Sequence, residues 1–345
     1  MEFTTGGRLE VRITAADVGK RVSVRTLTGA QERVGRFTDT VGVLTAWTDG
    51  VLYVTRRDGV TVELAEAALV AGKVVPSTPA RRRGVPSASV RELTAAAARG
   101  WPAVESERLG EWTLRASDGF TARANSVLPR GDPGLPLDTA LDRVAGWYAA
   151  RGLVPRIQVV PEEDALLTRE LAERGWADER HAVLRVGALA PLADREPDAR
   201  VELSREPDEE WLARYGRASG GRADAAWGVL TGGPSVWFAK VRAPGATGGA
   251  PGAAGGAAAI GRCVVESRWA GFAAMETAPE QRRTGLAGAV MAELARRALD
   301  EGASAAYLQV ETENSAARAL YDRLGFADHH SYHYRRAPAG LTEGI

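Results

Sequence analysis

The stretch that decides the fold covers residues 273–326 and reads AAMETAPEQRRTGLAGAVMAELARRALDEGASAAYLQVETENSAARALYDRLGF. Its first residues, up to Thr277, run into Pro279, which suits the end of a strand and not its middle. Beyond a turn of small residues, apolar side chains recur every four positions and share one face of a helix: Leu286, Val290, Leu294 and Ala298. The pattern predicts a strand, a glycine-containing turn and the N-terminus of a helix.

This turn is suited to bind an anion. The first N–H groups of a helix have no partners inside the helix, and the helix dipole places partial positive charge at the same end. Arg282 and Arg283 precede the turn and add side-chain charge that suits phosphate. A dinucleotide turn would read G-x-G-x-x-G and a P-loop G-x-x-x-x-G-K-[ST], and neither pattern occurs here. A plain helix cap would explain Gly285 but not the arginine pair.

A second block follows that helix. Residues 306–310 (AYLQV) predict a buried strand, and Asn314 is a good N-cap for the next helix. Gly325 supplies the C-terminal stop of this second helix. Residues at helical spacing share one of its faces: Ala317, Leu320, Tyr321 and Leu324.

The two blocks together resemble the GCN5-related N-acetyltransferases (GNAT). Arg282, Gly285 and Ala287 match R-x-x-G-x-A, and the second block matches L-Q-V-E-x-x-N-x-x-A-x-x-L-Y-x-x-x-G-F. Both blocks stand in the order and at the distance of that family. The resemblance implies an acyltransferase that moves the acetyl group of acetyl-CoA to a primary amine by direct attack in a ternary complex, with CoA as the product.

The resemblance also implies the residues of the site. The turn holds the pyrophosphate, backbone N–H groups at the end of the preceding strand polarise the thioester carbonyl, and Asn314 contacts the pantetheine arm. Tyr321 occupies the position of the general acid that gives a proton to the leaving thiolate. The implied acetyl-CoA contacts are Met275, Glu276, Thr277, Arg282, Arg283, Thr284, Gly285, Leu286, Ala287, Gly288, Asn314, Ala317 and Tyr321.

The sequence leaves the general base open. An acceptor amine is mostly protonated at neutral pH and must lose a proton before it attacks. Glu276, on the strand before the turn, is the first candidate; Glu311 and Glu313 follow, and a water relay would serve equally well. Cys263 stands in the middle of a predicted strand, and we expect it to be a small buried hydrophobe rather than a nucleophile.

Composition limits the class of function. The chain has 345 residues with 44 basic and 44 acidic side chains, so no overall attraction to nucleic acid or to an acidic membrane surface is implied. A single cysteine excludes an intrachain disulfide, and the histidines show no metal-ligand spacing, so we expect no metal site. No apolar run reaches the length of a membrane span, and the first residues show no signal-peptide pattern. We therefore expect a soluble, cytoplasmic protein.

The chain divides into four parts by pattern. Residues 1–75 read as short strands between turns and predict a small all-β barrel similar to an SH3-like domain, which we expect to be a packing module rather than an adaptor. Residues 76–89 form a linker rich in Pro and Ser. Residues 90–190 and 191–345 repeat one order of strands and helices. The expected class is α/β (α+β), a tandem GNAT fold with mixed central sheets and flanking helices, whose catalytic domain is the second copy.

The first copy lacks the implied cofactor residues. At an offset of 150 residues, Leu171 stands where the second copy has Tyr321. Residues 129–136 (PRGDPGLP) replace the arginine–glycine turn, and their prolines remove N–H donors where a phosphate would need them. We therefore expect a degenerate half without a CoA site. Within it, residues 111–116 and 120–127 are expected to pair as strands.

The acceptor amine stays open. Residues 209–230 and the loop at 244–257 are expected to frame its site, and a protein lysine, a protein N-terminus, a polyamine, an antibiotic or another small amine would fit the chemistry. We expect no membrane or nucleic-acid partner, and a homo-oligomer is left open. The alternative to an enzyme is a non-catalytic acyl-CoA-sensing or protein-binding module that uses the GNAT fold and the SH3-like head.

Overall fold

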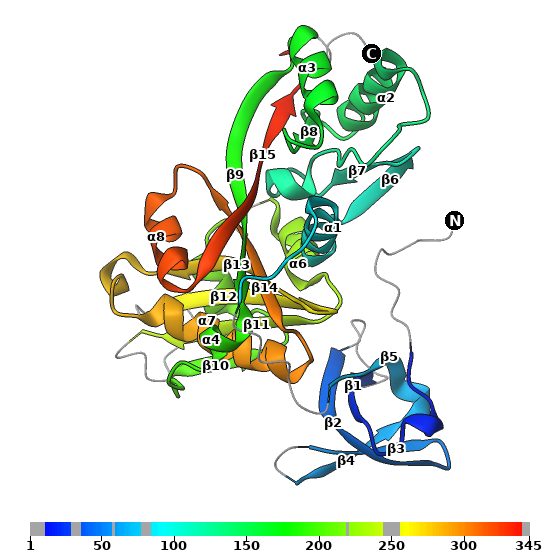
Figure 1. Ribbon diagram of the computed structural model, residues 1–345, viewed down its shortest axis with the longest axis vertical. Coiled ribbons are helices and arrows are strands. Elements are labelled where there is room, and N and C mark those ends of the chain that lie inside the picture. Colours follow the sequence, from blue (N-terminus) through cyan, green and yellow to red (C-terminus); the bar gives the residue numbers. More distant parts are fainter. Residues whose placement is uncertain are drawn as a thin grey trace.

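The computed structural model describes residues 11–28, 36–56, 59–76, 84–218, 221–243 and 256–339. Residues 77–83 of the expected linker and residues 244–255 of the expected acceptor loop lie outside these segments. Figure 1 shows the N-terminal sheet at one end of the molecule and a long twisted sheet extending through the remainder. Within the described segments, no helix combines the length and apolar character needed to cross a bilayer.

The N-terminal sheet has five antiparallel strands in the order β4-β3-β2-β1-β5. Alternating side chains bury one face of this sheet, and Asp49 and Gly50 both have positive φ, which lets the chain reverse tightly between β2 and β3. The strand-rich prediction is confirmed, while closure into an SH3-like barrel stays a prediction. Its elements are η1 (Ala15–Asp17), β1 (Arg21–Thr28), β2 (Arg36–Thr48), β3 (Val51–Thr55), β4 (Thr61–Ala65), η2 (Glu66–Ala68) and β5 (Leu69–Val74).

An eight-stranded mixed sheet organises the rest of the chain, in the order β10-β11-β12-β13-β14-β9-β15-β8. Strands β13 and β14 run parallel, and the other neighbouring pairs described run antiparallel. In chain order the strands are β8 (Arg156–Val159), β9 (Ala177–Ala188), β10 (Val201–Ser204), β11 (Val236–Arg242), β12 (Ala257–Glu266), β13 (Trp269–Thr277), β14 (Ala305–Glu311) and β15 (Phe326–Arg336). Because β9 lies between β14 and β15, the two predicted copies share one sheet.

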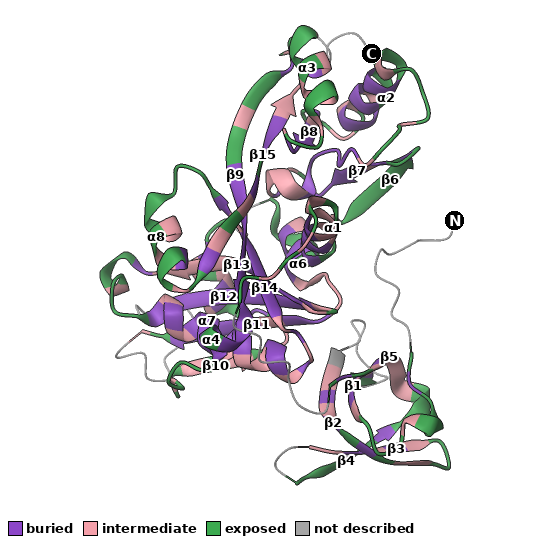
Figure 2. Ribbon diagram, in the orientation of Figure 1, coloured by how far each residue is buried: buried purple, intermediate pink, exposed green. Residues whose placement is uncertain are grey.

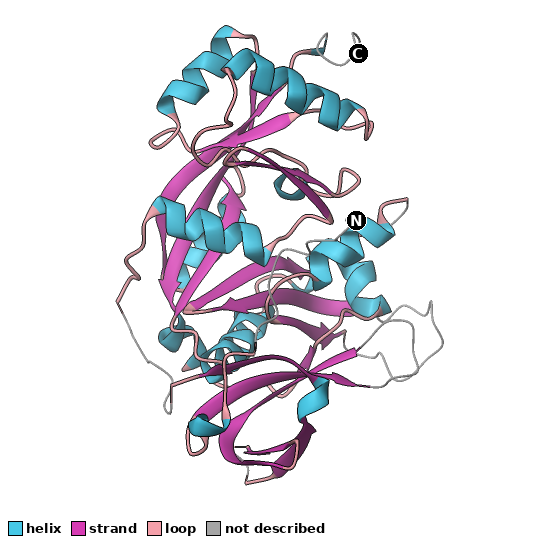
Figure 3. Cartoon of the chain, turned by 90° about the vertical axis from the view of Figure 1, so that its right-hand side faces the viewer, coloured by secondary structure: helices cyan, strands magenta, loops and turns pink. Residues whose placement is uncertain are grey.

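Helices cover both faces of this sheet (Figures 1 and 3). On one face, α4 (Leu189–Ala193) and α7 (Leu286–Asp300) pack against the strands through an apolar cluster that includes Val290 and Leu294. On the other face, α5 (Glu209–Tyr215) and α6 (Ala223–Thr231) pack through Trp211 and Leu230. The central strands are therefore buried from both sides, as Figure 2 shows for β12 to β14.

A smaller group of elements surrounds β8. It contains α2 (Leu137–Ala149) and α3 (Ala165–Glu173), whose apolar residues pack together with Trp112 and Ile157. The remaining elements are α1 (Val90–Gly100), β6 (Glu105–Leu109), β7 (Trp112–Ala116), η3 (Ala122–Ala124), η4 (Pro279–Gln281) and α8 (Ser315–Arg323).

The predicted pairing of residues 111–116 with residues 120–127 is wrong. Strand β7 pairs instead with β6, whose sequence ESERL is mostly exposed and carries no apolar alternation. After β7 the chain turns through η3, and the amide oxygen of Asn125 accepts hydrogen bonds from the backbone N–H groups of Ser117 and Gly119 at 2.8 and 2.9 Å. These donors are used inside a closed loop, so they do not form a ladder.

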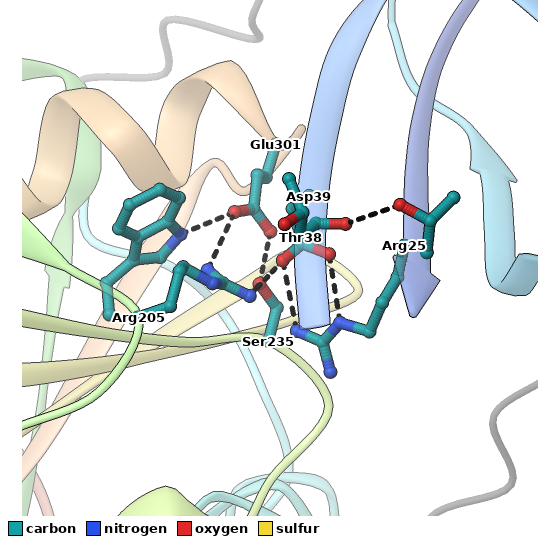
Figure 4. A network of polar contacts seen from close by, with 8 residues as sticks. Arg25, Thr38, Asp39, Arg205, Ser235 and Glu301 are labelled. Atoms are coloured by element: carbon teal, nitrogen blue, oxygen red, sulfur yellow. Dashed lines mark hydrogen bonds and ion pairs between the residues drawn. The ribbon is translucent and has the colours of Figure 1, made fainter. Parts of the chain in front are cut away.

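A buried polar network fastens the N-terminal sheet to the large one (Figure 4). Asp39 of β2 accepts from Nε and Nη2 of Arg25 at 2.9 and 3.0 Å, and it also accepts from Arg205, which follows β10. Arg205 reaches the hydroxyl of Ser235 at 3.2 Å, and that hydroxyl donates to Glu301 at 2.7 Å. One carboxylate of the N-terminal sheet therefore pairs with an arginine of the second half.

The environment of Asp39 keeps it ionised. Burial alone would raise the pKa of Asp39, but the hydrogen bond from Arg25 and the charge of Arg205 outweigh burial and hold the pKa below its ordinary value. The side chain of Asp39 is 5% exposed, so its negative charge is compensated almost entirely by protein groups.

Candidate active site

The end of β13 departs from regular strand geometry. Glu276 pairs with Ile260 and Ala273 pairs with Arg262, so two residues of β13 oppose Gly261 alone in a β-bulge. Ala274, one of those two, has a φ of 51°. Bulges re-aim side chains and interrupt ladders, and such departures cluster at functional sites.

At the same place β13 parts from β14. Their parallel ladder begins at Trp269 with Ala305 and ends at Phe272 with Leu308, although β13 continues to Thr277 and β14 to Glu311. Beyond Phe272 the ladder no longer uses the backbone groups on that edge of β13. Strand ends that diverge in this way leave backbone groups without a partner in the ladder between the two strands.

The turn after β13 has the predicted strand–turn–helix form. Gly285 is the N-cap of α7 with a φ of 91°, and a Cβ placed on it would meet no atom within 4 Å. Glycine is required there by backbone conformation and not by space. Arg282, Arg283 and Thr284 are exposed beside it, and neither arginine forms an ion pair with a described residue. The turn is an open, positively charged helix start.

A third arginine lies close to the same turn and was not found from the sequence. The guanidinium of Arg195, which follows α4, comes within 3.6 Å of the point that a Cβ on Gly288 would occupy. Arg195 is exposed and far from the turn in sequence, so no local pattern pointed to it.

Tyr321 lies on α8 and packs in the same apolar cluster as Leu286 and Val290 of α7. The predicted N-cap of this helix is confirmed, since the Asn314 side chain accepts from the N–H of Ala317 at 3.1 Å. The ring of Tyr321 meets the edge of Phe326 at 6.0 Å between centroids, and Phe326 meets Phe272 at 6.4 Å. This chain of rings links Tyr321 to the last residue pair of the β13–β14 ladder.

The hydroxyl of Tyr321 holds its proton firmly. The side chain is 8% exposed, and burial raises its pKa to about 12 against the opposing charge of Arg185. At neutral pH the hydroxyl is therefore a hydrogen-bond donor. It is a weaker acid than a free tyrosine of pKa ~10.

Arg185 holds α8 in place, and sequence reasoning missed it. This buried residue of β9 donates to the carbonyls of Arg318 and Phe326 at 3.0 and 2.9 Å and forms ion pairs with Asp322 and Asp328. Those partners lie on both sides of Tyr321 in the chain. The available signal was a single arginine inside the apolar run HAVLRVGALA.

Glu276 and Met275 point to opposite faces of the sheet. Met275 packs with the cluster beneath α7. Glu276 lies on the side of Tyr215, at the end of α5, where its charge adds to the larger effect of burial in raising the pKa of that tyrosine. Burial raises the pKa of Glu276 above its ordinary value, against the charges of Arg217 and Arg214. The structure therefore puts Glu276 on the side of α5, which is the expected acceptor side.

The other candidate groups have simpler surroundings. Glu311 and Glu313 are exposed at the end of β14 and in the turn that follows. Cys263 is fully buried and burial raises its pKa, which confirms the prediction of a small apolar residue. Two histidines, His181 and His333, stack at 5.1 Å beside Asp178, which also lies 3.9 Å from a guanidinium nitrogen of Arg335.

Comparison with known proteins gives consistent results. Residues 87–335 match the family described as "Probable histone acetyltransferase Rv0428c C-terminal". The "Probable histone acetyltransferase Rv0428c" of Mycobacterium tuberculosis is 33% identical over 327 residues, which span 93% of this chain and 95% of that protein. The "Uncharacterized N-acetyltransferase YobR" of Bacillus subtilis is 26% identical over 254 residues, which span 71% of this chain and 98% of that protein.

A solved structure shares the fold. The "GCN5-related N-acetyltransferase from Kribbella flavida" superposes with a TM-score of 0.52 at 19% sequence identity. The superposition covers 72% of this chain and 95% of that chain. At this level of identity the likeness concerns the arrangement of strands and helices.

Proposed function

Since the chain belongs to the GCN5-related N-acetyltransferases, we propose that it moves the acetyl group of acetyl-CoA directly to a primary amine in a ternary complex. One observation supports the proposal. The charged turn at Gly285 begins α7, and Tyr321 packs in the same apolar cluster as α7, linked through the ring of Phe326 to Phe272, where the β13–β14 ladder ends. The reaction needs anion binding, polarisation of a carbonyl and supply of a proton, and these groups would supply them.

The cofactor would bind along this opening. The N–H groups of Leu286, Ala287 and Gly288, with the side chains of Arg282 and Arg283, suit the pyrophosphate. The open space at Gly285 fits close approach of a phosphate to the backbone. The rest of the proposed contact set runs from the strand end to α8 and comprises Met275, Glu276, Thr277, Thr284, Asn314, Ala317 and Tyr321.

In the proposed reaction, different groups of the chain carry out the separate steps. Bound acetyl-CoA supplies an activated thioester. Backbone N–H groups at the bulge of β13 stabilise negative charge on the thioester oxygen during attack. Glu276, whose burial makes it a stronger base than a free glutamate, takes a proton from the acceptor amine directly or through water. The hydroxyl of Tyr321 donates a hydrogen bond and then its proton to the leaving sulfur. The amine nitrogen gains the acetyl carbon as the carbon–sulfur bond breaks.

The acceptor is proposed as a primary amine, with a protein lysine as one member of the class. The M. tuberculosis relative carries "histone acetyltransferase" in its name, which supports including protein lysine. The side of Glu276 also carries Arg214 and Arg217, so a strongly cationic acceptor would meet like charge there. Small amines and protein substrates should both be screened.

Calorimetric titration of acetyl-CoA tests the cofactor site. We expect Gly285→Asp to abolish binding, because it adds a side chain and a negative charge at the turn. Gly175→Asp is the matched control, since Gly175 is exposed, has a φ of 75° and also has no atom within 4 Å of an added Cβ. Equal loss in both variants, or no binding by the wild type, contradicts the assignment. Binding without turnover on any amine would favour an acyl-CoA-sensing module.

A further inference from the structure

A cluster of two histidines and one aspartate lies where β9 pairs with β15. Asp178 and His181 belong to β9, and His333 belongs to β15. Each residue offers one atom of a kind that binds metals, an imidazole nitrogen or a carboxylate oxygen, and these atoms lie within 4.8 Å of one another. Within the described segments, this is the one group of three or more such residues close enough to share a metal ion.

A β-bulge brings the three side chains onto one face of the sheet. The ladder between β9 and β15 shifts register so that His333 alone opposes both Arg180 and His181. Arg180 has a φ of 56°, which residues other than glycine rarely adopt. In a regular strand, residues three apart such as Asp178 and His181 point to opposite faces. The extra residue reverses this alternation, so both side chains reach His333.

His333 has a ring nitrogen without a partner. Its side chain is 6% exposed, and its Nε2 atom is buried with no hydrogen-bond partner among the described residues. Oδ1 of Asp178 lies 3.7 Å away, too far for a hydrogen bond, and the ring of His181 stacks on that of His333 with 5.1 Å between centroids. A buried polar atom without a partner is costly and indicates a missing one. Because both neighbouring groups are themselves metal ligands, an ion held among the three would supply that partner.

The spacing of the three groups suits zinc. Oδ1 of Asp178 lies 2.9 Å from Nε2 of His181 and 3.7 Å from Nε2 of His333. Bonds of about 2.0–2.2 Å to a tetrahedral zinc place neighbouring ligand atoms about 3.4 Å apart, which falls between these two distances. Imidazole favours zinc, whereas magnesium and calcium prefer sets of oxygen ligands. The donor set and its spacing therefore both match zinc.

The surroundings give the ion access and orient the carboxylate. The side chains of His181 and Asp178 are 59% and 40% exposed, so an ion can enter from solvent and keep water as its remaining ligand. The other oxygen of Asp178, Oδ2, lies 3.9 Å from Nη2 of Arg335, which also donates to the carbonyl of Trp176. This guanidinium holds Oδ2 and leaves Oδ1 for the ion. Since its charge opposes a cation, we expect micromolar rather than tighter affinity.

We propose that Asp178, His181 and His333 bind one zinc ion, which clips β9 to β15. Strand β9 belongs to the first predicted half of the chain and β15 to the second, so the ion would join the halves within their shared sheet. Its role is structural, because none of the three residues belongs to the proposed acetyl-CoA contact set. Our expectation of no metal site rested on spacing along the chain, which does not detect ligands from two distant strands.

Calorimetric titration of zinc chloride into the full chain, prepared without a histidine tag and treated with a chelator, tests this proposal. The wild type should bind one equivalent. His181→Asn removes an exposed ligand and should bind about 100-fold more weakly or worse, because changes to groups that only orient metal ligands already cost about 10–100-fold. His329→Asn is the matched control: His329 contacts the carbonyl of Ala88 outside the cluster, and this variant should bind like the wild type. Magnesium chloride should not bind.

The melting temperature provides a second readout. Zinc that binds only the folded chain should raise the melting temperature of the wild type and of His329→Asn, but not that of His181→Asn. Should His181→Asn fail to fold, Asp178→Asn removes the charge of another exposed ligand and carries the test. The proposal is overturned by absence of zinc binding to the wild type, by equal zinc affinities in the wild type and both ligand variants, or by magnesium binding as tightly as zinc.

Discussion

Replacing Asp39 by Asn tests how the N-terminal sheet is held. The change keeps the shape of the side chain but removes the negative charge between Arg25 and Arg205. Breaking a buried ion pair by removing one partner costs about 3–5 kcal/mol. Because the side chains of Arg25 and Arg205 are 11% and 20% exposed, solvent can partly rescue them, and we expect about 3 kcal/mol.

Urea unfolding followed by circular dichroism measures this loss, and hydrogen–deuterium exchange of β1 and β2 locates it. Asp198→Asn removes a carboxylate in the same fork geometry, but its partner Arg200 is 66% exposed, so its midpoint should match that of the wild type. The comparison separates loss of a buried charge from loss of hydrogen bonds alone.

The pH dependence gives an independent check. The pKa of Asp39 is lowered in the folded state, so its contribution to stability is fully present above the ordinary value of ~3.9 and is lost as the pH falls toward the folded value. The difference between wild type and variant should therefore stay constant from pH 7 down to about pH 4 and narrow only below that value. Equal midpoints at pH 7, or a difference that widens as the pH falls, would refute the reasoning.

Three further predictions concern the active site. Tyr321→Phe should lower kcat by about 100-fold or more and leave the Kd of acetyl-CoA unchanged; an unchanged kcat would remove the hydroxyl from the mechanism. Because burial raises the pKa of Glu276, the acid limb of kcat/KM should lie above the ~4.3 of a free glutamate, with activity falling as Glu276 takes up a proton. In Glu276→Gln the acid limb of kcat/KM should disappear. If the limb persists, another group causes it. Arg185→Met should lower both the melting temperature and kcat, because α8 loses its anchor; a normal kcat would contradict the positioning role, and Arg169→Met, at an exposed site, is the control.

Local patterns explain why the C-terminal unit could be predicted. Helical spacing, the N-cap Asn314 and the turn glycine at 285 are decided by residues close in sequence, and the structure has each of them in place. The same reasoning missed α1, whose buried positions are mostly small residues such as Ala96 and Ala97 and give little apolar contrast. It also mispaired β7, because β6 is polar.

The remaining features depend on residues far apart in the chain. Nothing in the apolar sequence of β9 identifies β14 and β15 as its neighbours in the sheet. The network around Asp39 joins the N-terminal sheet to Arg205, Ser235 and Glu301, which are far apart in the chain. It has no local signature.

The position of β9 in the sheet determines how much of the chain must be synthesised before the sheet can form. When β14 leaves the ribosome, the strand that it must pair with has already been synthesised, while β15, the other neighbour of β9, emerges last. A fragment that begins at residue 191 would leave β14 and β15 without the strand between them. Each half must therefore wait for the final strand, and the chain has to be expressed whole for either half to complete its sheet.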